Sequence, residues 1–229
     1  MATKCFIPVL GKRIRVTRLD ECGNVPTAGT ANSFIATDGF VTVSLSSEVE
    51  DGAEIIKKKA DGSLCVNEKQ SASFKRFNVE IEFCGVNPSL LSTVTNAEEY
   101  GSGSDVNGIV VPEGALTKNF ALEVWTGLSG QACGAGVEEA SGYLLLPFVG
   151  AGVLGDIEIG GEDAATFSLT GAFTKGGNAW GVGPYKVTGT TAAPTGLPTA
   201  LDPLDHLLLI DTGIAPPPSA CDPSAMPAA

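Results

Sequence analysis

Apolar and polar residues alternate along much of this chain, and this period of two constrains its fold more than any other feature. Val79, Ile81 and Phe83 would share one face of an extended segment. Glu80 and Glu82 would share the opposite face. Because successive side chains of a strand point to opposite faces, this segment is expected to be a half-buried strand with two carboxylates on its hydrated face.

The same alternation predicts strands throughout the chain. They are expected at residues 14–19, 40–45, 120–126, 143–149, 153–159, 165–174, 185–188 and 206–212. Gly, Asp or Pro punctuate nearly every gap between them, and long helical periodicity is nearly absent. The one convincing helix is expected at residues 87–96, where Asn87 can cap and Pro88 can occupy the first helical position. The expected fold is mainly β, a β-sandwich or barrel-like unit with one short flanking α-helix and long loops.

Residues 46–76 are too polar to form a core, and they are expected to form a projecting hairpin or loop. The dipeptide Asp61-Gly62 lies between two apolar stretches, as is typical of a tight hairpin turn with positive φ. The charged residues of this region that could take part in contacts are Glu50, Asp51, Glu54, Lys57, Lys58, Lys59 and Asp61.

The ends of the chain differ in composition from its middle. Residues 1–12 are expected to form an N-terminal arm, and residues 13–212 a single domain containing a Pro-rich connection at 190–203. Residues 213–229 are rich in Pro and Ala, so they are expected to be a disordered tail. The start of the chain lacks the features of a signal peptide, and no apolar stretch reaches the length of about 18 residues needed to span a bilayer.

Charge and residue usage disfavour several classes of function. The chain has 26 acidic and 14 basic residues, for a net charge of −12, which disfavours a static nucleic-acid clamp. It has one histidine, His206, whose place in an alternating segment favours a structural role over that of a catalytic base. Six cysteines without a Cys-x-x-Cys pair favour reduced thiols over a zinc site, although disulfides stay open. No enzymatic activity and no cofactor are expected.

The glycines at 150, 152 and 155 match the spacing of a dinucleotide-binding fingerprint. That chemistry requires a helix after the glycines and an acidic residue about 20 positions further on. Residues 156–161 alternate like a strand instead, and position 175 is Lys175. We interpret the glycines as a turn between strands.

Seven segments, in order and spacing, together resemble the major tail proteins, or tail tube proteins, of long-tailed, non-contractile actinobacterial phages. The segments are residues 15–23, 37–45, 79–84, 87–91, 120–127, 141–147 and 180–185. The resemblance covers about residues 13–212 and implies a tail-tube fold whose subunits form hexameric rings. The rings would stack into a hollow tube around the tape-measure protein, with tail terminator and tail-tip proteins as further partners.

The resemblance also implies a virion protein that is assembled in the host cytoplasm, with no catalytic residues, no membrane and DNA present only in transit. If six subunits each contribute about four strands, a closed barrel of about 24 strands has a backbone diameter of roughly 48 Å. A DNA duplex would pass through such a bore. An acidic lining would repel phosphate and let the genome slide.

Two sets of residues are therefore candidates for function. Glu80, Glu82, Asp156 and Glu158 are hypothesised to face the lumen, with an outward, solvated face as the alternative. The charged residues of 46–76 are hypothesised to make contacts between rings. A tube protein of a contractile injection system and a stand-alone β-sandwich binding module remain alternative functions.

Overall fold

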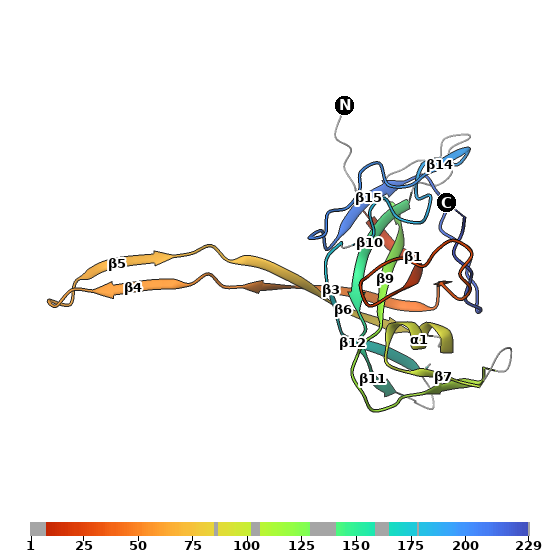
Figure 1. Cartoon of the computed structure of the whole chain (residues 1–229), viewed down its shortest axis with the longest axis horizontal. Coiled ribbons are helices and arrows are strands. Elements are labelled where there is room, and N and C mark those ends of the chain that lie inside the picture. The colour runs from red at the N-terminus through yellow and green to blue at the C-terminus, as the bar shows by residue number, and fades with distance from the viewer. Residues whose placement is uncertain are drawn as a thin grey trace.

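The structure is a computed structural model that describes residues 8–84, 87–101, 106–128, 141–158, 165–177 and 179–228. Strands account for 52% and helices for 4% of these described residues, which are mainly β with one short helix, as the alternation predicts. A body of packed strands carries one long two-stranded projection, which Figure 1 shows extending far to one side.

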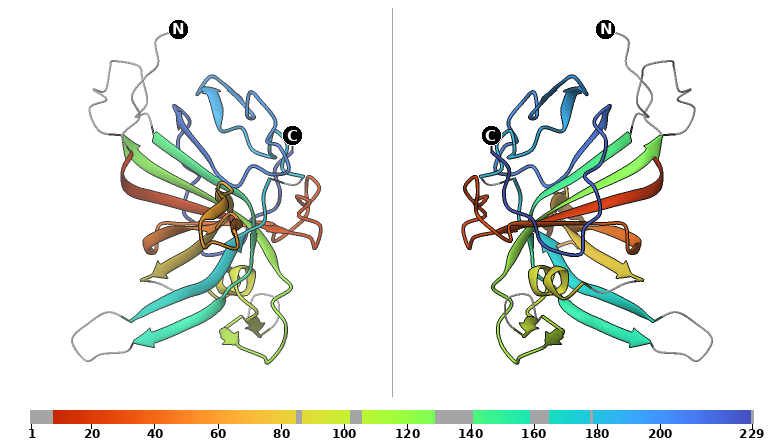
Figure 2. Two further views of the ribbon diagram at one scale, coloured as in Figure 1. Left: turned by 90° about the vertical axis from the view of Figure 1, so that its left-hand side faces the viewer. Right: turned by 90° about the vertical axis from the view of Figure 1, so that its right-hand side faces the viewer.

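Nine strands form one antiparallel sheet that folds over into two layers (Figures 1 and 2). The first layer, here called the covered sheet, contains in spatial order β2 (Phe34–Thr37), β1 (Pro8–Leu19), β9 (Asn119–Leu128), β10 (Ser141–Gly150) and β15 (Leu208–Thr212). The second layer, here called the exposed sheet, contains β3 (Phe40–Glu50), β6 (Ser73–Phe83), β12 (Thr166–Thr174) and β11 (Val153–Glu158). The layers join where Val149 and Gly150 of β10 pair with β12.

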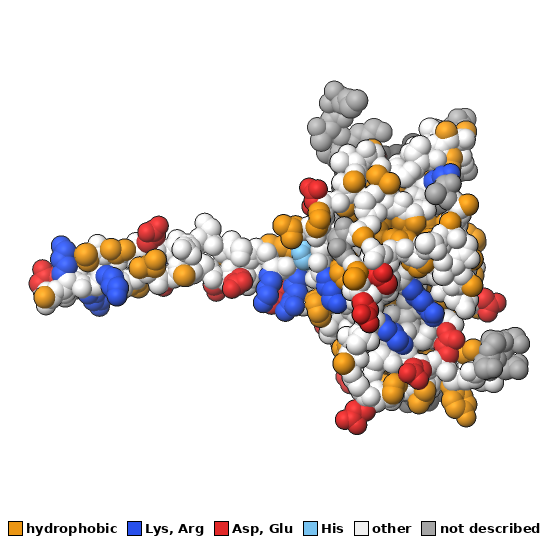
Figure 3. Space-filling view, viewed as in Figure 1, with side chains coloured by type: hydrophobic (Ala, Val, Ile, Leu, Met, Phe, Trp, Pro, Cys, Tyr) orange, Lys and Arg blue, Asp and Glu red, His pale blue; other side chains and the backbone are white. Residues whose placement is uncertain are grey.

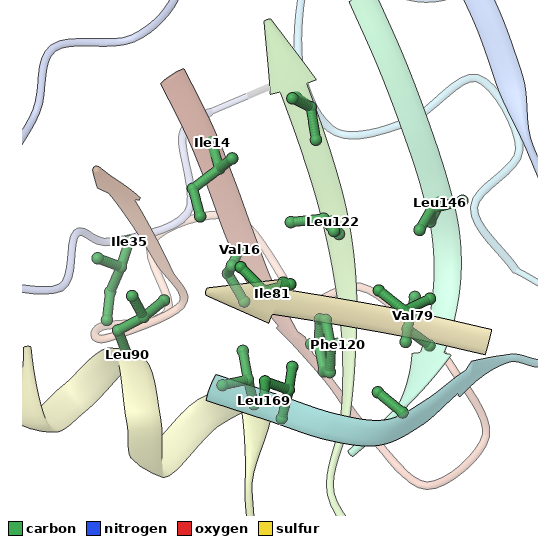
Figure 4. Close-up of a cluster of buried hydrophobic side chains, with 14 of the residues drawn as sticks. Ile14, Val16, Ile35, Val79, Ile81, Leu90, Phe120, Leu122, Leu146 and Leu169 are labelled. Atoms are coloured by element: carbon green, nitrogen blue, oxygen red, sulfur yellow. The ribbon is translucent and has the colours of Figure 1, made fainter. Parts of the chain in front are cut away.

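The main hydrophobic core lies between these two layers. In Figure 4, β6 of the exposed sheet runs across β1 and β9 of the covered sheet. Val79 and Ile81 point toward the covered sheet, as their alternation with Glu80 predicts. The buried side chains of this core are Ile14, Val16, Ile35, Val79, Ile81, Phe83, Leu90, Val94, Phe120, Leu122, Val124, Leu146, Val149, Leu169 and Ala172.

The expected helix is present as α1 (Pro88–Val94). The side chain of Asn87 accepts hydrogen bonds from the backbone N–H groups of Ser89 and Leu90, which satisfies two otherwise unpaired donors of the first turn. Leu90 and Val94 pack into the main core. A small sheet of β7 (Glu98–Tyr100) and β8 (Gly108–Val110) follows the helix.

The second face of the covered sheet is also buried, because the C-terminal part of the chain packs against it. Trp180, Tyr185 and Leu197 from this layer contact a second core cluster that includes Trp125 and Tyr143 of the covered sheet. The layer contains a small hairpin of β13 (Thr188–Thr190) and β14 (Ala193–Thr195), and β14 lies within the region expected as a Pro-rich connection at 190–203. Since both faces of β9 are covered, its residues are buried at consecutive positions instead of alternate ones.

The described residues near both ends of the chain are more ordered than their composition suggests. β1 begins at Pro8, so residues 8–12 of the expected N-terminal arm belong to a strand that pairs with β9. The expected disordered tail at 213–229 is wrong for the described residues up to 228. Ser224 bridges Phe34 of β2, and the side chain of Met226 is buried. The tail cannot form a core alone, but a sheet edge supplies hydrogen-bond partners for its backbone.

Three smaller expectations differ in detail. The strands expected at 185–188 and 206–212 begin instead at Thr188 and Leu208. Alternation within the strand expected at 40–45 places Val41 on one face with Val43 and Leu45, yet Val41 is 49% exposed. The pairing of β3 with β6 shifts register between Phe40 and Thr42, so an extra residue is accommodated at Val41 and its side chain turns outward.

The glycine motif at 150–155 forms a turn between strands, as interpreted from the sequence. β10 ends at Gly150 and β11 begins at Val153, with no helix between them. A Cβ atom on Gly152 would lie 2.3 Å from the carbonyl oxygen of Thr170. The glycine therefore allows close approach of two backbones and forms no phosphate cradle.

Candidate assembly surfaces

The outer face of the exposed sheet carries carboxylates and hydroxyls. Val79, Ile81 and Phe83 of β6 are buried, whereas Glu80 is exposed and Glu82 is half-buried. The strand register places Glu80 opposite Ser44 of β3, and it places Glu82 between Thr42 of β3 and Ser168 of β12. This face is hydrated and acidic, because alternation leaves the polar residues of each strand on the side away from the core.

The structure brings three of the four proposed lumen residues together. Glu80, Glu82 and Asp156 line one shallow depression across β6, β12 and β11. Glu158 is the last residue of β11, but its side chain lies outside the described part of the structure. Five hydroxyl-bearing residues line the same depression: Thr42, Ser44, Thr166, Ser168 and Thr170.

The sequence reasoning missed this hydroxyl lining. The sequence pattern that could have revealed this lining is the alternation in β12, where Thr166, Ser168 and Thr170 occupy every second position. Such a face attracts no polyanion, since it presents negative charge and neutral hydrogen-bonding groups.

The two outer strands of the exposed sheet have open edges. Among the described residues, β3 pairs only with β6 in this sheet, and β11 pairs only with β12. An edge strand presents unpaired N–H and C=O groups that can pair with a strand of another chain. Both outer edges of the exposed sheet are therefore open to pairing with a strand of another chain.

The projecting hairpin, here called the arm, extends β3 and β6 beyond the body through β4 (Glu54–Lys58) and β5 (Leu64–Lys69) (Figure 1). Its tip is the predicted turn, where Gly62 has a φ of 86° and the N–H of Lys59 donates to the carbonyl of Ser63 over 2.8 Å. The hydroxyl of Ser63 donates to the Asp61 carboxylate over 2.7 Å. The arm agrees with the hairpin expected at 46–76.

All seven charged residues hypothesised to make ring contacts lie on the arm and are exposed. Glu50 ends β3, Asp51 lies in the break before β4, and Glu54 begins β4. The remaining four lie toward the tip: Lys57, Lys58, Lys59 and Asp61.

The sequence reasoning missed the apolar side chains of the arm. Figure 3 shows hydrophobic side chains along the arm beside charged ones. Six large apolar residues of the arm and its base are between 39% and 54% exposed: Val49, Ile55, Ile56, Leu64, Val66 and Phe74. An isolated two-stranded hairpin is marginally stable in water, so a second surface is needed to cover these residues.

Ion pairs hold the base of the arm. Arg76 of β6 donates to the carboxylate of Glu48 of β3 over 2.6 and 3.2 Å, and Lys75 lies 3.1 Å from the same group. These hydrogen bonds, first that of Arg76 and then that of Lys75, lower the pKa of Glu48 to about 2. The guanidinium carbon of Arg76 also lies 4.8 Å from the centre of the Phe173 ring.

His206 lies beside the base of the arm. Its Nδ1 atom is 2.7 Å from the hydroxyl of Thr174, and its ring packs edge-on against Phe74 with centroids 5.3 Å apart. Burial lowers its pKa. These contacts agree with the structural role favoured by the sequence.

A buried polar cluster lies between the covered sheet and the C-terminal layer. Arg15 donates to both carboxylate oxygens of Glu123 over 2.5 and 2.6 Å, and the hydroxyl of Tyr143 donates to the same carboxylate over 2.6 Å. The guanidinium carbon of Arg15 lies 3.3 Å from the centre of the Tyr185 ring. Burial and then the charge of Glu123 raise the pKa of Tyr143. Glu123 is fully buried, so the cluster joins two layers and offers no surface to a ligand.

Other kinds of site find little support in the described ranges. No group of three His, Cys, Asp or Glu side chains there is placed to hold a metal ion. No helix among them is long and apolar enough to cross a membrane. Four cysteines, Cys22, Cys65, Cys84 and Cys221, are exposed, whereas Cys5 and Cys133 lie outside the described residues.

Comparisons with known proteins do not assign a family. Neither the models of known protein families nor the curated proteins include a match to this chain.

Proposed function

We propose that this chain is a structural virion protein that assembles into stacked hexameric rings and forms the tail tube of a long-tailed phage. The tube would be a negatively lined conduit for DNA during genome ejection. The observation that carries the proposal is the exposed sheet, which has four strands, one face on the core, one acidic and hydroxylated face, and two open edges.

Joining β3 of one subunit to β11 of the next would close six exposed sheets into one barrel. Closure removes the open edges, which is the usual solution for a sheet whose edges would otherwise aggregate. Glu80, Glu82 and Asp156 of every subunit would then line the bore, because their side chains lie on the face opposite the core.

The arm supports the second level of assembly. It reaches far beyond the body and carries apolar residues that need a covering surface (Figures 1 and 3). A neighbouring subunit in the same or the adjacent ring would supply that surface, with the charged residues of the arm at the rim of the contact. The tape-measure protein would occupy the lumen before ejection, and tail terminator and tail-tip proteins would meet the two ends.

Two other functions use the same fold. A tube protein of a contractile injection system would also form rings, and a stand-alone binding module would stay monomeric. The extended arm favours an assembling protein over the binding module, because its exposed apolar strip would disfavour a soluble monomer at high concentration.

The proposal is tested by electron microscopy of the purified full chain, together with sedimentation across a wide range of concentration and salt. Hexameric rings or hollow tubes with a bore wide enough for duplex DNA are expected. Monomers under all conditions would contradict the proposal and favour a binding module. Tubes that recruit a contractile sheath would support the injection-system function instead.

A further inference from the structure

The last described part of the chain forms an extended strap along an edge of the covered sheet. The strap, residues 219–226, runs antiparallel to β2, which is the last strand of that sheet on this side. β2 is short, and its other side pairs with β1. Without the strap, the outer edge of β2 would present open backbone groups in the same way as β3 and β11.

Backbone hydrogen bonds hold the strap along its length. The N–H of Ser224 donates to the carbonyl of Phe34 over 2.8 Å, and the N–H of Phe34 donates back to the carbonyl of Ser224 over 3.2 Å. Further bonds run from Ala220 to Ala36 at 3.0 Å, from Met226 to Thr30 at 2.9 Å, and from Gly29 to Met226 at 2.8 Å. The strap therefore pairs with β2 at Ser224 and Ala220 and with the loop before β2 at Met226, although its composition is poor for strand formation.

One apolar side chain anchors the strap. Met226 is 3% exposed and packs in the second core cluster with Trp125 and Tyr185, whereas the neighbouring Ala225 is exposed. Polar contacts near the other end join Ser219 to Asp38 over 3.1 Å. Main-chain pairing with one inserted side chain is how sheet edges bind extended peptides.

The segment before the strap is a run of three prolines. Pro216, Pro217 and Pro218 cannot donate backbone hydrogen bonds, and the Arg13 side chain donates to the carbonyl of Pro217 over 3.0 Å. The strap is thus tied to the domain by a proline-rich linker and is held by β2, by the loop before β2 and by the pocket of Met226.

We propose that the outer edge of β2 is a strand-addition site and that the strap is a detachable cap occupying it. The cap restricts pairing between copies to the β3 and β11 edges of the exposed sheet. A copy that has lost the cap can add strands at a third edge, and it then associates in the wrong geometry. The cap belongs to the single subunit, so it does not require the tube to exist.

The test uses the full chain with Met226→Asp, which places a charge in the apolar pocket, and Ala225→Asp as the matched control on the exposed side of the same strand. A fluorescent peptide of residues 214–228 is titrated into each. We expect the peptide to bind the Met226→Asp chain at least ten-fold more tightly than the control chain, whose own strap competes. The same peptide carrying Met226→Asp should not bind.

Hydrogen exchange reports release of the strap directly. The amides of Ser33 and Phe34, which donate to Ser224, should lose protection at least ten-fold in the Met226→Asp chain and keep it in the control. Sedimentation should show extra self-association of the Met226→Asp chain that the unmodified peptide reverses. Protection in β9 verifies that the body is folded.

The proposal is overturned if the peptide binds all chains equally or none, or if the Ser33 and Phe34 amides stay protected in the Met226→Asp chain. If that chain unfolds, Ser224→Pro replaces it, because the substitution removes the N–H that donates to the Phe34 carbonyl and leaves Met226 in place. A wild-type chain that never forms rings would contradict the tube and leave these readouts of the cap unchanged.

Discussion

The covered sheet and the arm contain the same antiparallel pairing in opposite surroundings. In β9, the residues from Phe120 to Val124 are at most 5% exposed, because the exposed sheet covers one face and the C-terminal layer covers the other. In β4 and β5, apolar side chains such as Ile55 and Leu64 are 44% and 54% exposed. Hydrogen-bonded pairing makes strands of β9 and of β4 and β5 alike. Only burial of the strand faces stabilises a strand within one subunit.

The ion pairs of the two regions differ in the same way. Arg15 and Glu123 form a two-pronged pair at the centre of the body, whereas Arg76 and Glu48 form one at the base of the arm, where about a third of each side chain is exposed. The hydrogen-bond geometry of the two pairs is similar, so their solvent exposure decides how much each pair contributes to stability. The body therefore buries its central ion pair and strands within one subunit, whereas the arm leaves its ion pair and apolar side chains partly exposed to solvent.

Removal of the buried carboxylate should have the largest effect on stability. Glu123→Ala leaves the Arg15 guanidinium buried without a counter-charge and takes the acceptor from Tyr143. Loss of one partner of a buried pair costs about 3–5 kcal/mol. Chemical denaturation should show this loss, and Glu113→Ala, at an exposed position, should change the unfolding free energy little. A loss of unfolding free energy below about 1 kcal/mol for Glu123→Ala would contradict the claim that this buried pair stabilises the body.

Acid should loosen the base of the arm before the body. The folded state lowers the pKa of Glu48 from its ordinary value near 4.5 to about 2. The stabilisation is therefore present above about pH 4.5 and is lost as the pH falls toward 2. Hydrogen exchange near the pairing of Glu48 with Arg76 should increase in this window relative to Glu48→Gln, which lacks the titrating group.

Glu50→Gln is the control for this measurement, since Glu50 is exposed at the end of the same strand. It should keep the wild-type pH dependence. Identical exchange in wild type and Glu48→Gln from pH 5 to pH 2.5 would show that the ion pair does not hold the base.

Deletion of the arm should separate stability from assembly. Removal of residues 53–70 joins Gly52 to Ser71, which lie side by side, because a Cβ on Gly52 would be 2.8 Å from the carbonyl oxygen of Ser71. The unfolding free energy of the body should change by less than about 0.5 kcal/mol, as expected for surface changes. Long tubes should no longer form. Electron microscopy checks this, and normal tubes from the deleted chain would refute the role of the arm.

Charge reversal on the exposed sheet should have the smallest effect on folding. Glu80→Lys with Glu82→Lys should change the unfolding free energy by less than about 0.5 kcal/mol, because both side chains reach solvent. Genome ejection should slow, and added salt should weaken this effect as the screening length falls below about 10 Å. Ejection kinetics in assembled virions measure it, with Glu113→Lys as the control.

Unchanged ejection at low salt would contradict the lumen assignment. A density map that places Glu80 and Glu82 on the outer wall of the tube would contradict it as well. Either result would leave the fold of the subunit unaffected.

The elements predicted correctly are those that depend on near neighbours in the chain. Alternation over five residues placed Glu80 and Glu82 on the hydrated face of β6, Asn87 and Pro88 marked the start of α1, and Asp61-Gly62 marked the tip of the arm. Each signal acts within about four residues, through strand periodicity, capping or turn geometry. The candidate lumen carboxylates were therefore found from the sequence alone.

What the tertiary structure decided involves residues far apart in the chain. Arg15 and Glu123 are separated by 108 positions, so no local pattern could show that this carboxylate in β9 is fully buried and paired. The meeting of Asp156 with Glu80 and Glu82 depends on how β11, β12 and β6 align.

The tail shows the same division most clearly. By itself, residues 213–229 have a composition that cannot bury enough surface to fold. The edge of β2 supplies the missing hydrogen-bond partners, and the second core cluster supplies the pocket for Met226. Local composition determined that the tail has no structure of its own, and only the packed body decided that it has a place to dock, because docking depends on surfaces that exist after the rest of the chain has folded.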